Sequence, residues 1–250
     1  MKQTNRKILI IFLWLLIWQG ASIWIDEKIL LVSPISVLFR LFELMQTISF
    51  WSSIASSLIR IMFGFGIGFL FAILFAILSY RFFIIKEFLY PFVLTLKSVP
   101  VASFIILILI WVSSDMLSTV IAFFMVFPIL YESTLIGLQE CDEQLLEMAD
   151  VFDVPFKRRL RYIYVIEVLP YIQSGCSLAL ALAWKAGVAA EVIGLPNNSI
   201  GQQLYDAKIY LATDALFAWT IVILCISIIF ERLFLYVLNT LAKHIYQEER

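Results

Sequence analysis

Charged side chains are scarce in this sequence: only 15% of its 250 residues are Asp, Glu, Lys or Arg, and the formal net charge is −1. A chain so close to neutral has no overall positive field that would attract nucleic acid. Histidine occurs once, as His244, and the three cysteines (Cys141, Cys176, Cys225) lie far apart. They form no CxxC motif or disulfide framework, and these residues are too few for a zinc site built by the protein. We therefore predict no metal site in this chain.

Apolar side chains, by contrast, make up 62% of the chain, and the mean hydropathy is +0.96. Soluble domains have about half apolar and about a quarter charged residues. A chain of this length cannot bury so much apolar surface in its own core, so the excess must face lipid or other protein. This composition excludes a soluble enzyme and predicts one all-α membrane domain over residues 1–250, with no soluble domain at either end.

Six segments are apolar over a length close to the roughly 20 residues that a membrane helix needs. They are Ile8–Ile25, Ser57–Ser79, Leu89–Val112 (interrupted by Lys97 and Pro100), Met116–Leu138, Val168–Val192 and Ala215–Leu238. If the N-terminus is cytoplasmic, the inner segments hold far more Lys and Arg than the outer ones, which hold only Lys28, Arg40 and Lys208. By the positive-inside rule, both termini are predicted to be cytoplasmic.

The first apolar segment has an alternative interpretation as a cleaved signal peptide, because basic residues precede it. Its apolar run is long and contains Trp14, Trp18 and Trp24, and Gln19–Ser22 is a poor cleavage site. These features favour a membrane anchor. The following segment, Asp26–Trp51, is too polar to span, but its apolar residues recur at helical spacing, which predicts an amphipathic helix at the outer interface or packed on neighbouring spans.

The longest polar stretch on the predicted cytoplasmic side is Gln139–Glu167. It reads as two short amphipathic helices separated by Asp153-Val154-Pro155, since Asp tolerates turns and Pro suits the first turn of a helix. Leu169-Pro170 is expected to mark the entry to the fifth span. Taken alone, this hairpin could equally be an interfacial loop whose basic residues contact anionic lipid.

The hairpin resembles the EAA motif of bacterial ABC importer permeases. The matching residues are Glu147-Met148-Ala149, Asp153 three residues further on, and the later Leu169-Pro170. The family pattern has glycine where this chain has Asp153. Such a glycine closes the first helix with a positive φ, which Asp tolerates at a cost of about 1 kcal/mol.

The resemblance extends over residues 55–235. Ser57-Leu58-Ile59-Arg60 with Gly64, Gly66 and Gly68 is similar to the second-span signature of the nitrate/sulfonate/taurine-type permeases. Other matching elements are Ser98-Val99-Pro100 with Trp111, Ala183-Trp184-Lys185 with Val188-Ala189-Ala190-Glu191, and the block containing Gly201, Tyr205-Asp206-Ala207 and Asp214. The Gly64-x-x-x-Gly68 spacing itself favours close helix packing over phosphate binding, because no strand precedes it and no Lys-Ser/Thr follows it.

The resemblance implies a type I ABC importer permease fold with six spans, a core over residues 55–238 and a cytoplasmic coupling hairpin over residues 139–167. It implies a multi-pass protein of the bacterial plasma membrane that passes a small anionic or polar solute delivered by an extracytoplasmic binding protein. Two ABC ATPase subunits would bind ATP and Mg, because this chain has no Walker motif. A second copy of this permease would complete the pore. The residues expected at the ATPase contact are Glu147, Met148, Ala149, Asp153, Val154, Pro155 and Phe156.

Polar residues within the spans are candidates for the translocation pathway, because charges inside a membrane are rare. Pro100, Trp184, Lys185 and Glu191 are expected to line or flank it, with Lys185 favouring an anionic group. The alternative is structural: Lys97 reaches an interface, and Lys185 pairs with Glu191 or Glu132. For the whole chain, two other functions stay open. A self-sufficient secondary transporter or channel is disfavoured by the absence of inverted repeats, and a membrane enzyme by the absence of a nucleophile–base pair.

Overall fold

The computed structural model describes residues 2–27 and 29–247, and within these ranges the chain forms helices and no strand. The helices are α1 (Lys2–Ile25), α2 (Pro34–Met45), α3 (Ile48–Arg81), α4 (Phe83–Ser98), α5 (Val101–Ile108), α6 (Ser114–Gln139), α7 (Glu143–Val151), α8 (Phe156–Arg159), the π-helical turn η1 (Leu160–Tyr164), α9 (Val165–Gly194), α10 (Ile200–Ile209) and α11 (Thr213–Gln247). The prediction of an all-α membrane protein is confirmed.

In the described part of the chain, four helical segments are long and apolar enough to cross a membrane: Ile48–Arg81, Ser114–Gln139, Phe156–Gly194 and Thr213–Thr240. They correspond to the predicted second, fourth, fifth and sixth spans. The predicted third span is a pair, α4 and α5, bent by 108° at Val99-Pro100. Pro100 removes a backbone donor and forces Val99 out of the helical region, so the helix stops there. The apolar part of α1, Leu9–Ile25, is shorter, and the predicted count of six spans is not established.

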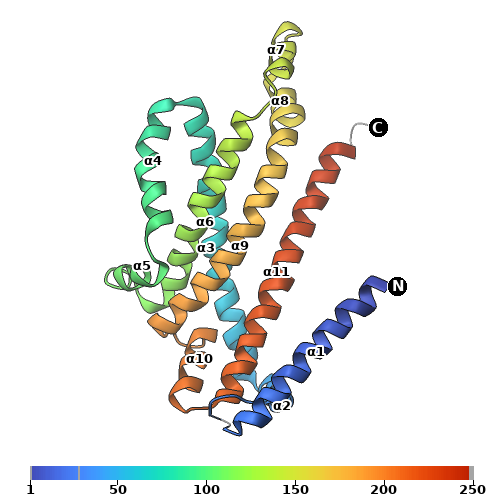
Figure 1. Cartoon of the computed structure of the whole chain (residues 1–250). Helices are drawn as coiled ribbons and strands as arrows, with labels where there is room; N and C mark the ends of the chain where they lie inside the picture. The colour runs from blue at the N-terminus through green and yellow to red at the C-terminus, as the bar shows by residue number, and fades with distance from the viewer. Residues whose placement is uncertain (1, 28, 248–250) are drawn as a thin grey trace.

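The centre of the bundle is formed by α3, α6 and α9, which run side by side (Figure 1). Gly64 and Gly68 allow α3 to approach α6 closely. A Cβ on Gly64 would lie 2.2 Å from the carbonyl oxygen of Thr119, and one on Gly68 would lie 3.0 Å from the Val126 side chain. The Gly64-x-x-x-Gly68 spacing therefore serves close helix packing, as predicted.

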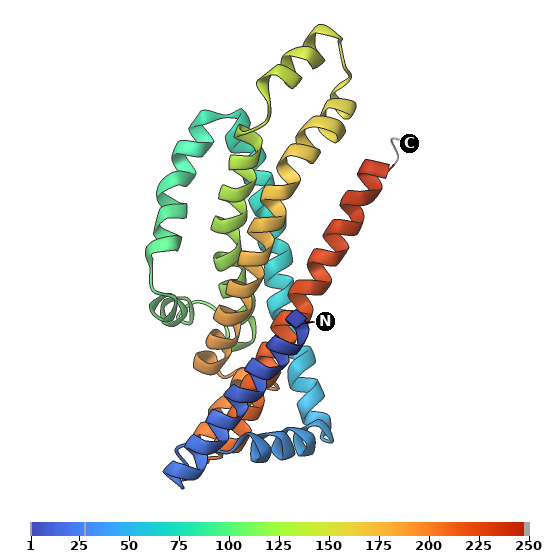
Figure 2. The same ribbon diagram turned by 45° about the vertical axis from the view of Figure 1, so that its right-hand side comes forward.

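The remaining long helices surround this centre more loosely. α11 packs along α9, α10 and α2, whereas α1 lies outside it and contacts α11 through the rings of Trp18 and Phe217. α2 begins at the N-cap Ser33, followed by Pro34, and lies across the base of the bundle (Figure 2). It buries Val37 against α11 but leaves Phe42 exposed, so the amphipathic helix predicted in this segment is present and packs on its neighbours.

The α7–α8 hairpin projects beyond the other helices at one end of the bundle, here called the hairpin end, while α2 and α10 lie at the opposite end, the α10 end (Figures 1 and 2). The second short helix was predicted to be separate from the fifth span. It is instead continuous with it, because α8, η1 and α9 follow one another without a break, and Pro170 lies inside α9 rather than at its start. Proline is accommodated here within the first two turns of α9, just after the π-helical turn.

Candidate functional site

The hairpin turn is closed by a left-handed residue at the position where the motif has glycine. Asp142 caps the start of α7 by accepting a hydrogen bond from the backbone N–H of Gln144 (2.8 Å), and Asp153 ends the turn with φ +50°. The N–H of Val154 donates to the carbonyl of Ala149 (2.9 Å), and the N–H of Asp153 donates to that of Asp150 (3.2 Å). This pair of bonds is a Schellman motif, which satisfies the last carbonyls of the helix.

A single arginine ties the two arms of the hairpin together. Arg159 donates to the Asp150 carboxylate at 2.5 Å and to the carbonyl oxygen of Ala149 at 3.3 Å. The Ala149 side chain is only 1% exposed. Ala149, expected at the ATPase contact, therefore lies inside the hairpin, where its small side chain permits the arms to close.

Four large apolar side chains are exposed around this turn: Met148, Val151, Phe152 and Phe156, the last three at 70–78%. We call them the hairpin apolar patch. Glu147, Asp153 and Pro155 are exposed beside it, and Val154 is half-buried. Val151 and Phe152 were not among the residues expected at the contact, although their position directly before the motif's turn was a usable signal. A projecting patch of this kind is typical of a surface that another protein covers.

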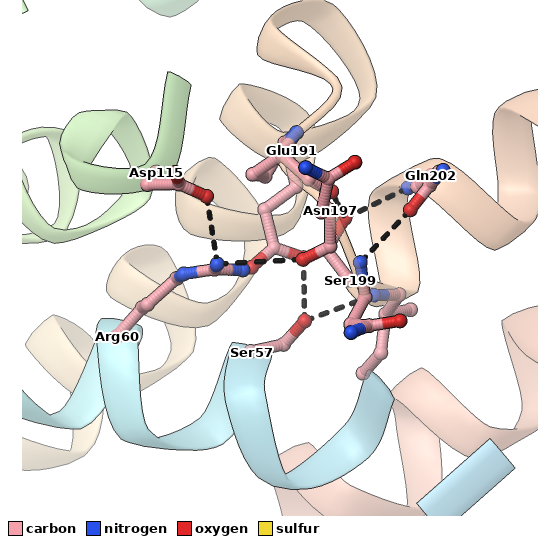
Figure 3. Close-up of polar contacts among 10 residues, drawn as sticks. Ser57, Arg60, Asp115, Glu191, Asn197, Ser199 and Gln202 are labelled. Atoms are coloured by element: carbon pink, nitrogen blue, oxygen red, sulfur yellow. Dashed lines mark hydrogen bonds and ion pairs between the residues drawn. The ribbon is translucent and has the colours of Figure 1, made fainter. Parts of the chain in front are cut away.

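A buried polar cluster ties α3 to the junction of α9 and α10 (Figure 3). The Ser57 hydroxyl donates to a carboxylate oxygen of Glu191 at 2.6 Å and accepts from the N–H of Ile200 at 2.9 Å. The same Glu191 oxygen accepts from the N–H of Gly201 at 3.2 Å. A Cβ on Gly201 would lie 2.3 Å from that of Glu191, so only glycine fits. Glu191, expected at the pathway, is fully buried in this junction.

Arg60 extends the cluster along α3 toward α6. Its guanidinium contacts the Asp115 carboxylate at 2.9 Å and the carbonyl of Asn197 at 3.4 Å, as Figure 3 shows. Ser57 and Arg60 come from one motif segment, Glu191 from another and Gly201 from a third. The structure thus places motif segments that lie more than a hundred residues apart in the sequence in direct contact.

The other residues expected at the pathway lie in different surroundings. Trp184 is 2% exposed, and its indole N–H donates to the carbonyl of Ile223 on α11 (3.1 Å). Pro100 is exposed at the bend between α4 and α5. Lys97 pairs with Glu132 on α6 at 2.6 Å. Lys185 is exposed on α9, and no carboxylate in the described part of the chain lies within ion-pair distance of it.

Lys185 continues a polar groove that sequence reasoning missed. This groove, of about 440 Å³, lies between α6, α9 and α11 and is lined by Ser133, Ser174, Gly175, Ser177, Leu178, Ala181 and Glu231. Ser177 donates to the Glu231 carboxylate at 2.5 Å. Residues 174, 178, 181 and 185 follow helical spacing, so Lys185 lies one turn beyond the groove on the same face of α9. Glu231, an acidic residue within the last span, was the available signal.

These features define a class: a polytopic helical membrane protein with a closely packed core, a polar groove on one face and a projecting hairpin with exposed apolar side chains. Residues 64–243 match the family described as "Binding-protein-dependent transport system inner membrane component", and the chain belongs to this family. The predicted resemblance to ABC importer permeases of the nitrate/sulfonate/taurine type is confirmed.

Three relatives illustrate the similarity. The aliphatic sulfonates transport permease SsuC of Bacillus subtilis is 27% identical over 213 residues, covering 82% of this chain and 75% of the relative. The taurine permease TauC of Escherichia coli is 25% identical over 220 residues (86% and 80%). The formylaminopyrimidine permease ThiX of Halalkalibacterium halodurans is 25% identical over 204 residues (80% and 79%).

The chain is therefore a membrane-embedded permease subunit of a bacterial ABC importer, located in the plasma membrane with several passes. Membership of this family implies two kinds of partner, an ATPase subunit and a substrate-binding protein. It also identifies the chain as a transport component rather than an enzyme.

Proposed function

We propose that the α7–α8 hairpin is the element through which this permease receives mechanical work from its ATPase. The observation that carries this is the hairpin apolar patch, which extends from α7 across the turn to the start of α8, on a hairpin whose arms are tied by Arg159 and the Schellman turn. A groove on the ATPase would cover Met148, Val151, Phe152 and Phe156, with Glu147, Asp153, Val154 and Pro155 around them. Ala149 would act by keeping the hairpin closed.

The orientation that follows has the hairpin end in the cytoplasm, both termini cytoplasmic, and six spans that include α1 and the bent α4–α5 pair. The Lys and Arg distribution supports this orientation. The start of α1 and the end of α11 both point away from the α10 end, in agreement with it (Figure 1). ATP and Mg would be bound by the ATPase alone, and residues 1–250 would form one permease domain.

The translocation pathway would run along the polar groove and Lys185. We propose that the serine hydroxyls of the groove replace part of the substrate's hydration shell, and that Lys185 attracts an anionic group. Trp184 would flank this route by fixing α9 against α11, Glu191 by fixing the α9–α10 junction, and Pro100 by bending the third span. The substrate would be a small anionic or polar solute delivered by the extracytoplasmic binding protein, since the relatives are named for sulfonates, taurine and formylaminopyrimidine.

The coupling role is tested by Phe152→Ser in the permease co-expressed with its ATPase subunit. Loss of one of the two aromatic side chains of the patch is expected to lower the amount of ATPase that co-purifies, and to abolish substrate-stimulated ATP hydrolysis in reconstituted membranes. Phe88→Ser is the matched control, because Phe88 is similarly exposed but lies on α4, away from the hairpin. Unchanged ATPase recovery and stimulation in Phe152→Ser would refute the assignment. Uptake without any ATPase subunit would instead support a secondary transporter.

A further inference from the structure

A second, almost entirely apolar groove lies at the hairpin end, between α3, α6 and the continuous α8–α9 segment. Its volume is about 590 Å³, within the roughly 300–1,000 Å³ range of ligand pockets. Its walls are formed by Ile73 and Ile77 of α3, Leu138 of α6, and Val168 and Ile172 of α9. These five residues belong to helical segments that are long and apolar enough to span the membrane, so this part of the groove lies at the level of lipid. The outer end of the groove is lined by Phe156 of α8 and Leu160 of η1.

The mouth of this groove is polar and basic. Tyr80 and Arg81 end α3 there, and the Tyr80 ring meets that of Tyr164 at 6.3 Å between centroids. Arg81 is exposed, and no carboxylate in the described residues lies within ion-pair distance of it. Lys157 and Arg158, exposed on α8, follow directly after the groove-lining Phe156. Arg81 therefore places a positive charge at the mouth of an apolar channel.

We propose that this groove binds one anionic phospholipid, with an acyl chain between Ile73, Ile77 and Ile172 and the phosphate on Arg81. An apolar groove that stays empty forfeits dispersion contacts along its walls, which an acyl chain restores. A guanidinium forms two parallel hydrogen bonds with a phosphate, and basic pockets between membrane helices select anionic head groups. The proposed orientation places this lipid in the cytoplasmic leaflet, and no other part of the inference depends on that orientation.

The charge of the mouth favours this lipid over a second copy of the chain as the occupant. The hairpin end of α3 and α8 offers Arg81, Lys157 and Arg158, so a symmetric contact of this surface with itself would bring like charges together. A phospholipid supplies both features in one molecule: its phosphate can lie at the basic mouth while its acyl chain lies between the apolar walls.

The test is native mass spectrometry of the permease complex purified in mild detergent, with palmitoyl-oleoyl phosphatidylglycerol and phosphatidylcholine as competing probes. The wild type is expected to retain phosphatidylglycerol preferentially. Arg81→Gln should lower its retention about tenfold, the loss of a charge-assisted contact, and leave phosphatidylcholine unchanged. Ile77→Trp, which fills the groove, should lower the retention of both lipids. Arg232→Gln is the matched control, because Arg232 is exposed on α11 and lies outside the groove.

Equal retention of phosphatidylglycerol by Arg81→Gln and by the wild type would overturn the proposal, and so would unchanged lipid retention in Ile77→Trp. If Ile77→Trp instead removed a second permease copy or an ATPase subunit from the spectrum while lipid stayed bound, the groove would be a protein contact. Because the hairpin apolar patch is unaltered in these variants, failure here leaves the coupling assignment intact.

Discussion

At the scale of single residues, the two glycines Gly64 and Gly66 differ sharply although they are only two positions apart. A Cβ at Gly64 meets the Thr119 carbonyl oxygen at 2.2 Å, whereas nothing lies within 4 Å of one at Gly66. The first glycine is needed because α6 touches the backbone there. The second faces open space, where its lack of a side chain only adds flexibility.

We therefore expect Gly64→Ala to destabilise the protein by about 1–3 kcal/mol through overpacking. Gly66→Ala should be neutral or stabilising by up to about 1 kcal/mol, because alanine is the better helix former. The temperature at which half of the detergent-solubilised protein stays monodisperse in size-exclusion chromatography measures the difference. A Gly66→Ala variant that loses as much stability as Gly64→Ala would contradict this account of α3 and α6.

Substitution of Lys185 tests the proposed translocation pathway most directly. Lys185→Met is expected to lower uptake of the transported substrate into vesicles about tenfold, a change of roughly 1.4 kcal/mol in the barrier for an anionic group. Recovery of the ATPase subunit should not change. Lys208→Met serves as the control, because Lys208 is also exposed but lies on α10. Normal uptake by Lys185→Met would leave this lysine with a structural role only.

At the scale of elements, α10 packs on α9 and α11 and is joined at its first turn to α3 by the buried polar cluster. Ser57 of α3 accepts from the first turn of α10 and donates to Glu191 of α9, so three helices share one hydrogen-bonded junction. A buried donor or acceptor that loses its partner costs about 1–3 kcal/mol. The junction therefore fixes the angle at which the chain returns to the last span, α11.

Glu191→Ala should accordingly lower thermal stability by about 1–3 kcal/mol, because the Ser57 hydroxyl and the Gly201 N–H lose their acceptor. Glu191→Gln should cost clearly less, since the amide oxygen can accept both bonds. Limited proteolysis of the loop around Asn197 and Asn198, together with thermal stability, provides the measurement. Equal losses in the two variants would mean that the carboxylate charge, rather than its role as acceptor, holds the junction.

At the scale of the whole molecule, the groove on the α6–α9–α11 face is open, so one chain does not enclose a pathway. An enclosed route needs a second wall, and we expect a second copy of the chain to provide it, with one ATPase subunit per hairpin. The mass of the intact complex in detergent should then correspond to two permeases and two ATPases. One copy of this chain beside a different permease, or beside two ATPases alone, would contradict the homodimer.

The sequence by itself determined the elements of this protein. Low charge and high hydropathy predicted an all-helical membrane chain, Pro100 predicted the break in the third span, and the residue at the motif's glycine position, Asp153, carries the predicted positive φ. Each of these features depends on composition or on local backbone sterics, which neighbouring residues specify. The ordered set of motifs likewise indicated the family, because it is a property of the sequence.

Only the tertiary structure decided which face of each helix is packed. Membrane helices are apolar all round, so periodicity does not reveal their buried side. The sequence therefore did not reveal that Trp184 and Glu191 are buried in helix contacts, and the serine groove had no signal except Glu231. The contact between Ser57 and Glu191 joins residues 134 positions apart, and no local rule predicts it, because it exists only once α3, α9 and α10 have packed together.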